Sequence, residues 1–185
     1  YYRGDYDGAY GEKVMLRVKN LWGLHTLRNI NLEVHEGEIL GLGGLSECGM
    51  HDLGRVMFGI DKFVCGEVLD EHGKPIVTTH GAAAAGVGYV SKNRDQESLM
   101  LQATIGYNIS LPSLDAVSVG KVISLKKEHA FVDGEIRELS IKCQGRDQRV
   151  RALSGGNKQK VAFAKWVGKK SKVLVLDCPT RGVDV

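Results

Sequence analysis

The sequence predicts an α/β protein with a largely parallel core sheet, because segments with strand periodicity alternate with segments with helix periodicity. A glycine-rich loop at 44–49 follows one predicted strand and precedes one predicted helix, which is the usual position of a phosphate-binding loop. Hydrophobic residues form 43% of the 185-residue chain and charged residues 25%, so we expect one globular domain of ordinary size.

The N-terminal part of the chain starts with a segment, 1–13, that is rich in Tyr, Gly and Asp and lacks hydrophobic periodicity. We expect it to be a linker from an upstream region. Apolar and polar residues alternate at 14–18 and again at 27–34, which predicts two strands. The apolar run at 39–42 predicts a buried strand that leads into the glycine-rich loop, and a helix is expected over 50–58.

The C-terminal part shows the same alternation. Thr79 is expected to cap an alanine-rich helix that ends at Ala85. The remaining predicted elements, in order, are a strand at 87–90, a helix at 126–139 that starts near Ser124, a helix at 156–167 and a strand at 173–176.

Composition limits the class of protein. The net charge of +3, from 25 basic and 22 acidic residues, gives no strong field, so no nucleic acid partner is expected. The four cysteines are far apart and form no metal-binding pair, which is typical of reduced thiols in the cytosol. No stretch approaches the ~20 apolar residues of a membrane span, so any membrane role requires a partner that spans the bilayer.

The candidate phosphate-binding loop reads, in order, Gly44, Leu45, Ser46, Glu47, Cys48, Gly49, Met50 and His51. Glycines at this spacing let backbone N–H groups face an anion at a helix N-terminus. The lysine and the Ser or Thr that normally complete such a loop are replaced by Met50 and His51, and Glu47 adds a negative charge. A plain strand-to-helix turn is the alternative interpretation, and triphosphate binding is expected to be weak in either case.

Two later strings carry a more specific pattern. The first comprises Leu153, Ser154, Gly155, Gly156 and Asn157, followed by Lys-Gln-Lys. The second starts at Asp177 and Cys178 and continues as Pro-Thr-Arg-Gly-Val to Asp184. The first string resembles the signature motif of ABC ATPases, and the second resembles a Walker B strand that leads into a D-loop. From about Met15 to Val185 the chain is similar to the C-terminal ATPase half of bacterial monosaccharide importers, which carry two such domains in one polypeptide.

The resemblance implies a P-loop NTPase fold of ABC type, with a mixed core sheet, a β-rich N-terminal edge and a helical subdomain at about 91–151. The ATP-binding domain would run from 14 to 185 and end after the D-loop. It implies ATP and Mg²⁺ as ligands, although binding in this half would be weak or absent. Expected partners are another ABC ATPase domain, in the same full-length polypeptide, and transmembrane permease subunits. The expected location is cytoplasmic, at the inner face of the membrane through the permease.

The resemblance also assigns roles to single residues. The Ser154 hydroxyl and the open amides after it would bind the γ-phosphate held by the opposite domain of a head-to-tail dimer, whereas the alternative is a helix merely capped by Ser154. Asp177 would hold a metal-bound water when nucleotide is present. Cys178 occupies the position of the general-base glutamate, and a thiol with an ordinary pKa of ~8.5 is a poor base at neutral pH.

Two further positions have altered or ambiguous chemistry. Trp22 lies where relatives place an aromatic residue against adenine, although packing in the core is an equal alternative. Lys92 occupies the Q-loop position, where many relatives use Gln or Glu, and an ammonium group cannot accept a hydrogen bond.

The expected function is that of an ATP-binding domain of an importer for a sugar or a related small solute. Its own nucleotide site would be degenerate, and its signature motif would act on nucleotide held by a partner domain. The alternatives are a hydrolytically active ABC half and a soluble ABC factor not linked to transport.

Overall fold

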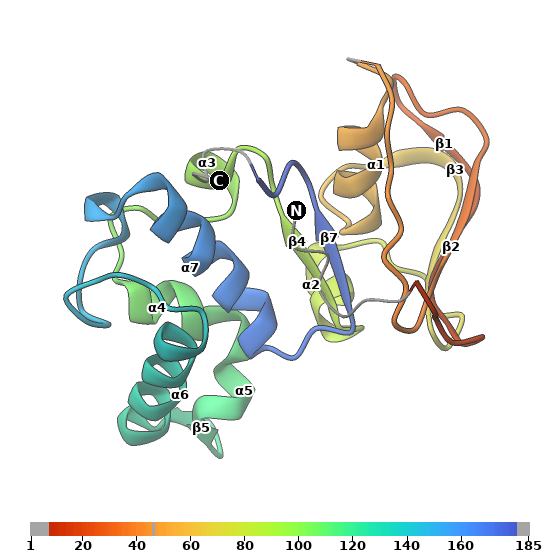
Figure 1. Ribbon diagram of the computed structural model, residues 1–185. Helices are drawn as coiled ribbons and strands as arrows, with labels where there is room; N and C mark the ends of the chain where they lie inside the picture. The colour runs from red at the N-terminus through yellow and green to blue at the C-terminus, as the bar shows by residue number, and fades with distance from the viewer. Residues whose placement is uncertain (1–7, 46, 181–185) are drawn as a thin grey trace. The chain divides into compact units, whose positions relative to one another are not determined.

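The computed structural model describes residues 8–45 and 47–180 (Figure 1). The chain divides into two compact units, residues 1–87 and 88–185. Residues 1–7 of the predicted linker at 1–13, Ser46 of the glycine-rich loop and Asp184 of the D-loop lie outside the described residues. Within the described ranges, no helix combines the length and the apolar character needed to cross a bilayer.

The first unit contains an antiparallel sheet of three strands in the order β2-β1-β3 (Figure 1). The strands are β1 (Val14–Gly23), β2 (Ile30–His35) and β3 (Phe63–Asp70). Leu16, Val18 and Leu21 of β1 are almost completely buried and form the centre of the core. The strands predicted at 14–18 and 27–34 are thus confirmed with shifted bounds, whereas β3 was missed.

The missed strand β3 contains Gly66 at φ +103°. A side chain at this position would place its Cβ 2.5 Å from the backbone oxygen of Asn20, so only glycine fits where β3 passes β1. A glycine inside a strand interrupts the alternating pattern on which sequence-based recognition depends.

Two helices complete the first unit. Helix α1 (Met50–Met57) confirms the helix predicted at 50–58 and buries Leu53, Val56 and Met57. Helix α2 (Thr79–Ala84) also forms, but its N-cap is Thr78, whose hydroxyl accepts a hydrogen bond from the Gly81 N–H. The prediction of Thr79 as the cap is therefore wrong by one residue. Both residues are threonines, and the choice depends on which one leaves helical geometry.

The strand predicted at 39–42 is wrong. These four residues are all described by the structure and form no strand, and Ile39, Leu40 and Leu42 are 71%, 40% and 46% exposed. An apolar run becomes a strand only where a neighbouring backbone supplies a ladder, and the glycine within this run, Gly41, weakens its strand preference.

The second unit is mainly helical. Strand β4 (Val87–Val90) pairs with β7 (Val173–Leu176), and both confirm their predictions. The other elements, in order, are α3 (Arg94–Glu97), α4 (Ile105–Ser110), the short 3-10 helix Leu111–Ser113, α5 (Leu114–Val117), the hairpin of β5 (Ser118–Val119) and β6 (Val122–Ile123), α6 (Leu125–Glu138), the 3-10 helix Val150–Ala152 and α7 (Gly155–Gly168). Helices α6 and α7 confirm the two long helices that were predicted.

The core of this unit forms where α4 packs against α6 and α7 (Figure 1). Ile105 and Ile109 of α4 are completely buried there, together with Val132 of α6 and Val161 of α7. Asn108 is also fully buried, and its amide is paired with the backbone of Met100 and Thr104 at 2.9–3.0 Å. Buried apolar side chains thus join α4, α6 and α7, while the Asn108 amide ties α4 to the backbone just before it.

Gly88 of β4 provides a test of this packing. A Cβ atom at Gly88 would lie 2.8 Å from Trp166 Cγ and 2.9 Å from Leu174 Cδ2. Gly88→Ala is therefore expected to lower the free energy of unfolding by about 1–3 kcal/mol, as overpacking does, in urea denaturation. Gly134 of α6 is the matched control, since its Cβ position meets nothing within 4 Å and its substitution by Ala should stabilise the protein by up to ~1 kcal/mol. Equal effects at the two glycines would contradict the packing.

Candidate functional site

The glycine-rich loop leads into the N-terminus of α1. Gly49 is the N-cap at φ +92°, and a Cβ atom there would lie 2.5 Å from the Thr26 hydroxyl, so glycine is required for both conformation and space. The first intrahelical bond runs from Leu53 N to Gly49 O at 2.9 Å, and no side chain caps the helix. The backbone geometry of an anion-binding helix start is thus preserved.

The exposed Cys48 side chain of the loop lies against Gly44. A Cβ atom on Gly44 would lie 2.5 Å from Cys48 Sγ, so the thiol packs directly on Gly44. The Cys48 N–H donates to the Leu45 carbonyl at 3.1 Å, which turns one of the loop's donors toward its own backbone. Both contacts reduce what the loop can offer to a phosphate.

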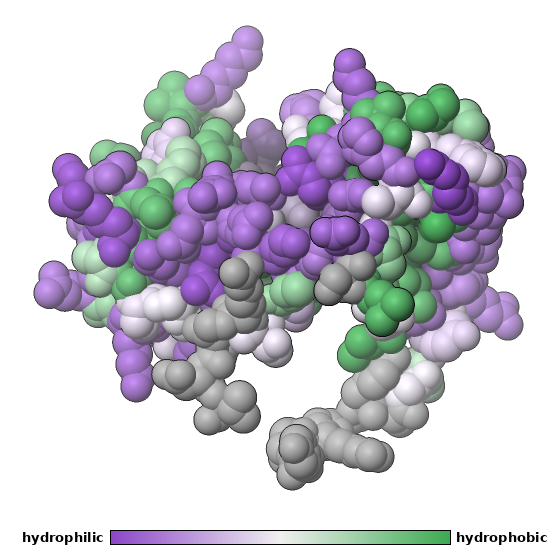
Figure 2. Space-filling model, turned by 90° about the horizontal axis from the view of Figure 1, so that it is seen from above, coloured by the Kyte–Doolittle hydropathy of each residue, from purple (hydrophilic) through white to green (hydrophobic). Residues whose placement is uncertain are grey.

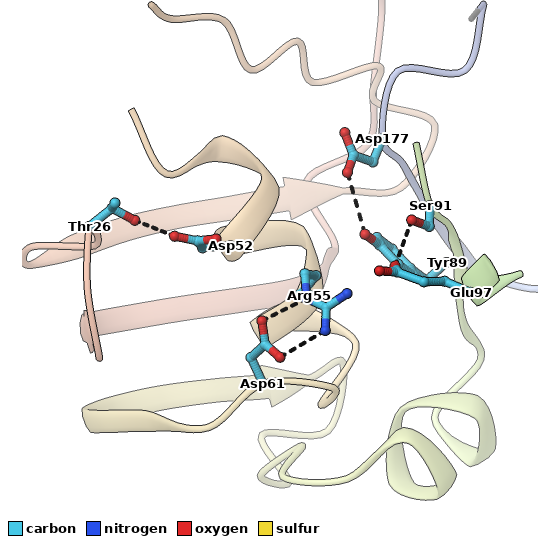
Figure 3. Close-up of polar contacts among 8 residues, drawn as sticks. All are labelled: Thr26, Asp52, Arg55, Asp61, Tyr89, Ser91, Glu97 and Asp177. Carbon is cyan, nitrogen blue, oxygen red and sulfur yellow. Dashed lines mark hydrogen bonds and ion pairs between the residues drawn. The ribbon is translucent and has the colours of Figure 1, made fainter. Parts of the chain in front are cut away.

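Two carboxylates flank the same helix start. Glu47 is exposed and held at φ +66°, a backbone conformation that costs a residue with a side chain ~1–2 kcal/mol. Asp52 lies in the first turn of α1 and accepts a hydrogen bond from the Thr26 hydroxyl at 2.5 Å (Figure 3). An acidic residue here stabilises the helix dipole but repels phosphate. Sequence reasoning missed Asp52, because an acid in a first turn usually signals only a helix start.

Two side chains occupy the positions where a phosphate-binding loop meets Mg²⁺ and a triphosphate. Met50 and His51 are half-buried at the positions of the lysine and of the Ser or Thr that ordinarily meet the phosphates and the metal. Neither side chain carries the ammonium or hydroxyl group that such a loop uses, and Glu47 and Asp52 add negative charge near the helix start.

Trp22 lies near the end of β1. Its side chain is 40% exposed, and the guanidinium carbon of Arg28 lies 5.9 Å from the ring centroid. Packing in the core, the alternative considered for Trp22, is therefore wrong. Contact with adenine stays a prediction, and the indole already holds a cation over its ring.

The signature segment forms the start of α7. Ser154 is an exposed N-cap residue, and the first intrahelical bond runs from Lys158 N to Ser154 O at 2.9 Å. The N–H groups of Gly155, Gly156 and Asn157 therefore precede the helical hydrogen-bond pattern. A Cβ atom at Gly156 would meet nothing within 4 Å, so the helix end is sterically open. Leu153, by contrast, is buried and anchors the segment.

The alternative interpretation, a helix merely capped by Ser154, requires a hydrogen bond between the Ser154 side chain and the helix start. The structure shows no such capping hydrogen bond. The Ser154 hydroxyl accepts a hydrogen bond from Asn157 Nδ2 at 2.9 Å instead. The amide of Asn157 is fixed in this orientation because its Oδ1 accepts from the Lys142 N–H at 2.8 Å. Since Asn157 donates to Ser154, the hydroxyl hydrogen of Ser154 is directed away from Asn157 and is available for an anion.

Asp177 follows the last residue of β7 within the second unit. Its N–H donates to Val90 O at 2.9 Å, and its carboxylate accepts a long 3.4 Å hydrogen bond from the hydroxyl of the buried Tyr89 (Figure 3). Cys178, at φ +51°, is exposed and carries a free thiol. The strand pair thus places Asp177 beside β4, in register with Val90.

Lys92 lies half-buried in the turn between β4 and α3. The turn is held by its own polar groups. The Ser91 hydroxyl donates to Glu97 at 2.7 Å (Figure 3) and accepts from the Asn93 N–H at 3.0 Å, and the Ser91 N–H donates to Ser98 Oγ at 3.1 Å. Lys92 is therefore presented by a turn of defined shape.

The four cysteines, Cys48, Cys65, Cys143 and Cys178, all have free thiols. Hydrophobic residues also reach the surface in places between the polar side chains that dominate the face shown in Figure 2. Exposed apolar residues are ordinary when scattered, and among the described residues two series of four lie closer together, at 39–45 after β2 and at 119–125 around β6.

Comparison with known proteins gives consistent matches. A family model described as ABC transporter matches residues 27–181. The ribose import ATP-binding protein RbsA of Lacticaseibacillus paracasei is 41% identical over 174 residues, which cover 93% of this chain and 35% of that protein. RbsA of Bacillus subtilis is 40% identical over 178 residues, which cover 96% of this chain and 36% of that protein. The chain thus spans about a third of the length of these relatives.

Solved structures show the same fold. The ATP-binding cassette MJ0796, in a dimer with ADP and Pi, has a TM-score of 0.77 at 21% identity and covers 92% of this chain and 76% of its own. The cbiO1 protein of Clostridium perfringens, part of an ABC transporter complex, has a TM-score of 0.70 at 25% identity and covers 94% and 68%. The chain therefore belongs to the ABC transporter family and has the α/β P-loop NTPase fold of its ATP-binding cassettes.

Proposed function

We propose that this chain is an ATP-binding domain of an importer for a sugar or a related small solute, and that its own nucleotide site is degenerate. ABC ATPase domains bind ATP, usually with Mg²⁺, dimerise with another ATPase domain and work with transmembrane permease subunits. The import role is supported by the 40–41% identity to ribose import ATP-binding proteins. The domain would comprise 14–185, with a helical subdomain at about 91–151, and would lie at the cytoplasmic face of the membrane through the permease.

One contrast between two helix starts carries this proposal. At α7 the amides are sterically open and Asn157 frees the Ser154 hydroxyl as a donor, which favours an anion. At α1 a thiol packs on Gly44 of the loop, and two acidic residues lie in the loop and in the first turn of the helix, which disfavours an anion. The signature segment is therefore suited to nucleotide held by a partner domain, whereas the chain's own loop is poorly suited to hold nucleotide.

The proposal includes a partner domain in the same full-length polypeptide. The chain spans about 35% of the length of its ribose-importer relatives, so a protein of their length has room for a second ATPase domain. A partner domain is needed because the chain's own loop is proposed to bind nucleotide poorly. The γ-phosphate that the signature segment contacts must then belong to a nucleotide bound by another domain.

The chain itself is expected to show no meaningful ATP turnover, because the lysine, the hydroxyl and the general base are replaced by Met50, His51 and Cys178. A phosphate-release assay on the purified chain measures this. Turnover of ~1 s⁻¹ or more that disappears in Asp177→Asn would support the hydrolytically active alternative instead.

Asn157 provides a sharper test of the signature segment. In Asn157→Asp the carboxylate would take the Ser154 hydroxyl hydrogen and add a negative charge next to the helix start. We expect ATPase activity of the full-length protein to fall ~100-fold, as when a phosphate- or oxyanion-binding donor is lost. Asn157→Ser keeps a donor without adding charge and should lose less activity. Equal losses in the two variants, with equal melting temperatures, would show that the orientation of Ser154 is irrelevant.

A further inference from the structure

A short hairpin projects from the second unit between α5 and α6 (Figure 1). Its strands β5 and β6 pair Val119 with Val122 and Ser118 with Ile123. Residues that face each other in an antiparallel pair point to the same side, so Val119 and Val122 expose one joint apolar surface. With the next two apolar residues they form the hairpin patch, whose members Val119, Val122, Ile123 and Leu125 are 62%, 72%, 45% and 66% exposed.

Polar contacts at the base of the hairpin hold its backbone in place. The Ser118 hydroxyl donates to the Leu114 carbonyl at 2.7 Å, and Lys127 Nζ donates to the Ser118 carbonyl at 3.3 Å. The Ser124 N–H donates to the Val117 carbonyl at 2.9 Å, where the hairpin ends and α6 begins. The apolar side chains are therefore exposed by a folded backbone, and little ordering is needed before they meet a partner.

Positive charge surrounds the hairpin patch. Lys121 lies in the hairpin turn, and Lys126 and Lys127 lie in the first turn of α6, all three exposed. The first turn of a helix is its positive end, where cations are unfavourable unless an anion lies near. Glu128 of the same turn is half-buried and accepts a hydrogen bond from the Ser110 hydroxyl at 2.7 Å. This arrangement favours a negatively charged partner.

The shape of the hairpin indicates what kind of partner fits. Gly120 in the turn, at φ +63°, has no atom within 4 Å of its Cβ position, so the tip is open on its outer side. A projecting apolar tip with lysines around it suits a soft surface that is apolar inside and anionic outside. The other exposed apolar series, at 39–45, contains no charged residue, whereas 114–128 contains three lysines and two acids. Only the hairpin series thus combines apolar exposure with positive charge.

We infer that the hairpin patch inserts into the headgroup region of an anionic membrane, with the ammonium groups of Lys121, Lys126 and Lys127 at the level of the lipid phosphates. Interfacial elements bury apolar side chains at the boundary of headgroups and acyl chains, and anionic lipids of the cytoplasmic leaflet attract lysines nearby. Lysine stems can follow apolar surroundings while the charged end stays in water. The inference rests on the proposed function only in that a permease brings the domain to this leaflet.

Flotation of the full-length protein with lipid vesicles, without permease or nucleotide, tests the inference. One set of vesicles contains equal parts of phosphatidylcholine and phosphatidylglycerol, and the other contains phosphatidylcholine alone. We expect partitioning onto the anionic vesicles to be at least ~10-fold stronger than onto the neutral ones. Added salt should reduce this difference, because it screens the attraction between lysines and lipid phosphates.

The apolar part of the contact is removed by Val119→Ser combined with Val122→Ser. This variant should partition onto anionic vesicles at least ~10-fold more weakly, because two exposed valines no longer leave water on binding. The matched control is Val64→Ser combined with Val77→Ser, since both of these valines are 66% exposed and lie outside the hairpin patch. The control should float like the unchanged protein.

Two further variants separate charge from insertion. Lys121→Gln combined with Lys126→Gln should remove most of the preference for anionic vesicles and leave partitioning onto neutral vesicles unchanged. Val122→Trp should strengthen partitioning several-fold, because tryptophan favours the interface, and brominated lipid should quench more of its fluorescence than that of the unchanged protein. A gain of this kind cannot result from a loss of fold.

Several outcomes overturn the inference. They are equal losses in the two valine pairs, or partitioning that does not depend on phosphatidylglycerol. Unchanged flotation of the Val119 and Val122 variant, together with loss of its assembly with the permease, would show that the patch contacts protein instead of lipid. Since the vesicles contain neither permease nor ATP, normal flotation without sugar transport by the unchanged protein counts against the proposed function alone.

Discussion

Gly155→Asp is expected to abolish ATP hydrolysis and solute transport by the full-length protein, although this chain is proposed to do no hydrolysis itself. Gly155 is the first residue of α7, where three N–H groups precede the helical hydrogen-bond pattern. A carboxylate at this point repels a γ-phosphate by ~1–4 kcal/mol, depending on exposure, and its own oxygen competes for the free N–H groups. ATPase and uptake assays on the same preparation measure both losses.

The result is informative only with the fold intact. An acidic residue in the first turn of a helix is favourable for the helix dipole, so Gly155→Asp should not lower the melting temperature. Gly134→Asp on α6 is a charge-matched control, because a side chain there meets open space. Full activity of Gly155→Asp would refute the assignment of the signature segment and leave it a structural role.

Repair of the glycine-rich loop should raise its affinity for Mg-ATP at least tenfold. Met50→Lys adds a cation at the position that meets the β- and γ-phosphates, and Glu47→Gly removes a negative charge. Glu47→Gly also relieves a residue held at φ +66°. Calorimetry on the purified chain compares the double variant with the unchanged protein.

Glu67→Gln is the control for this repair, because Glu67 is an exposed acid of β3 outside the loop. Its affinity for Mg-ATP should equal that of the unchanged protein. Micromolar binding by the unchanged protein would show that Cys48 and the two carboxylates move aside for nucleotide, and would make the degenerate site untenable.

The helices that could be predicted are those with long periodic patterns. Helix α6 and helix α7 appear at their predicted places because 14 residues of each carry enough of the pattern, and the cap residue of α6, Ser124, is also the predicted start. The six-residue helix α4 was not predicted, because its periodicity is too short to read, although its Ile105 and Ile109 form the centre of a core.

The candidate site shows the same limit. The motif positions of Met50, His51 and Cys178 are enough to predict that the usual lysine, hydroxyl group and general base are replaced. The contact of Cys48 with Gly44 does not, because it depends on how the loop closes on itself. The hydrogen bond of Thr26 to Asp52 joins residues 26 positions apart and needs a folded sheet before it exists. Motifs therefore predict which groups are present, whereas three-dimensional contacts decide what those groups can still bind.

The carboxylate of Asp52 lies in the first turn of α1, where its negative charge complements the positive end of the helix dipole. Where a loop binds a phosphate ligand, the bound ligand raises the free energy of unfolding by mass action. That free energy falls when the ligand concentration is low. Here the negative charge that complements the helix start is covalently part of the chain and is held in place by Thr26. Under the proposed function, the stability of this unit is therefore expected not to depend on the supply of ATP.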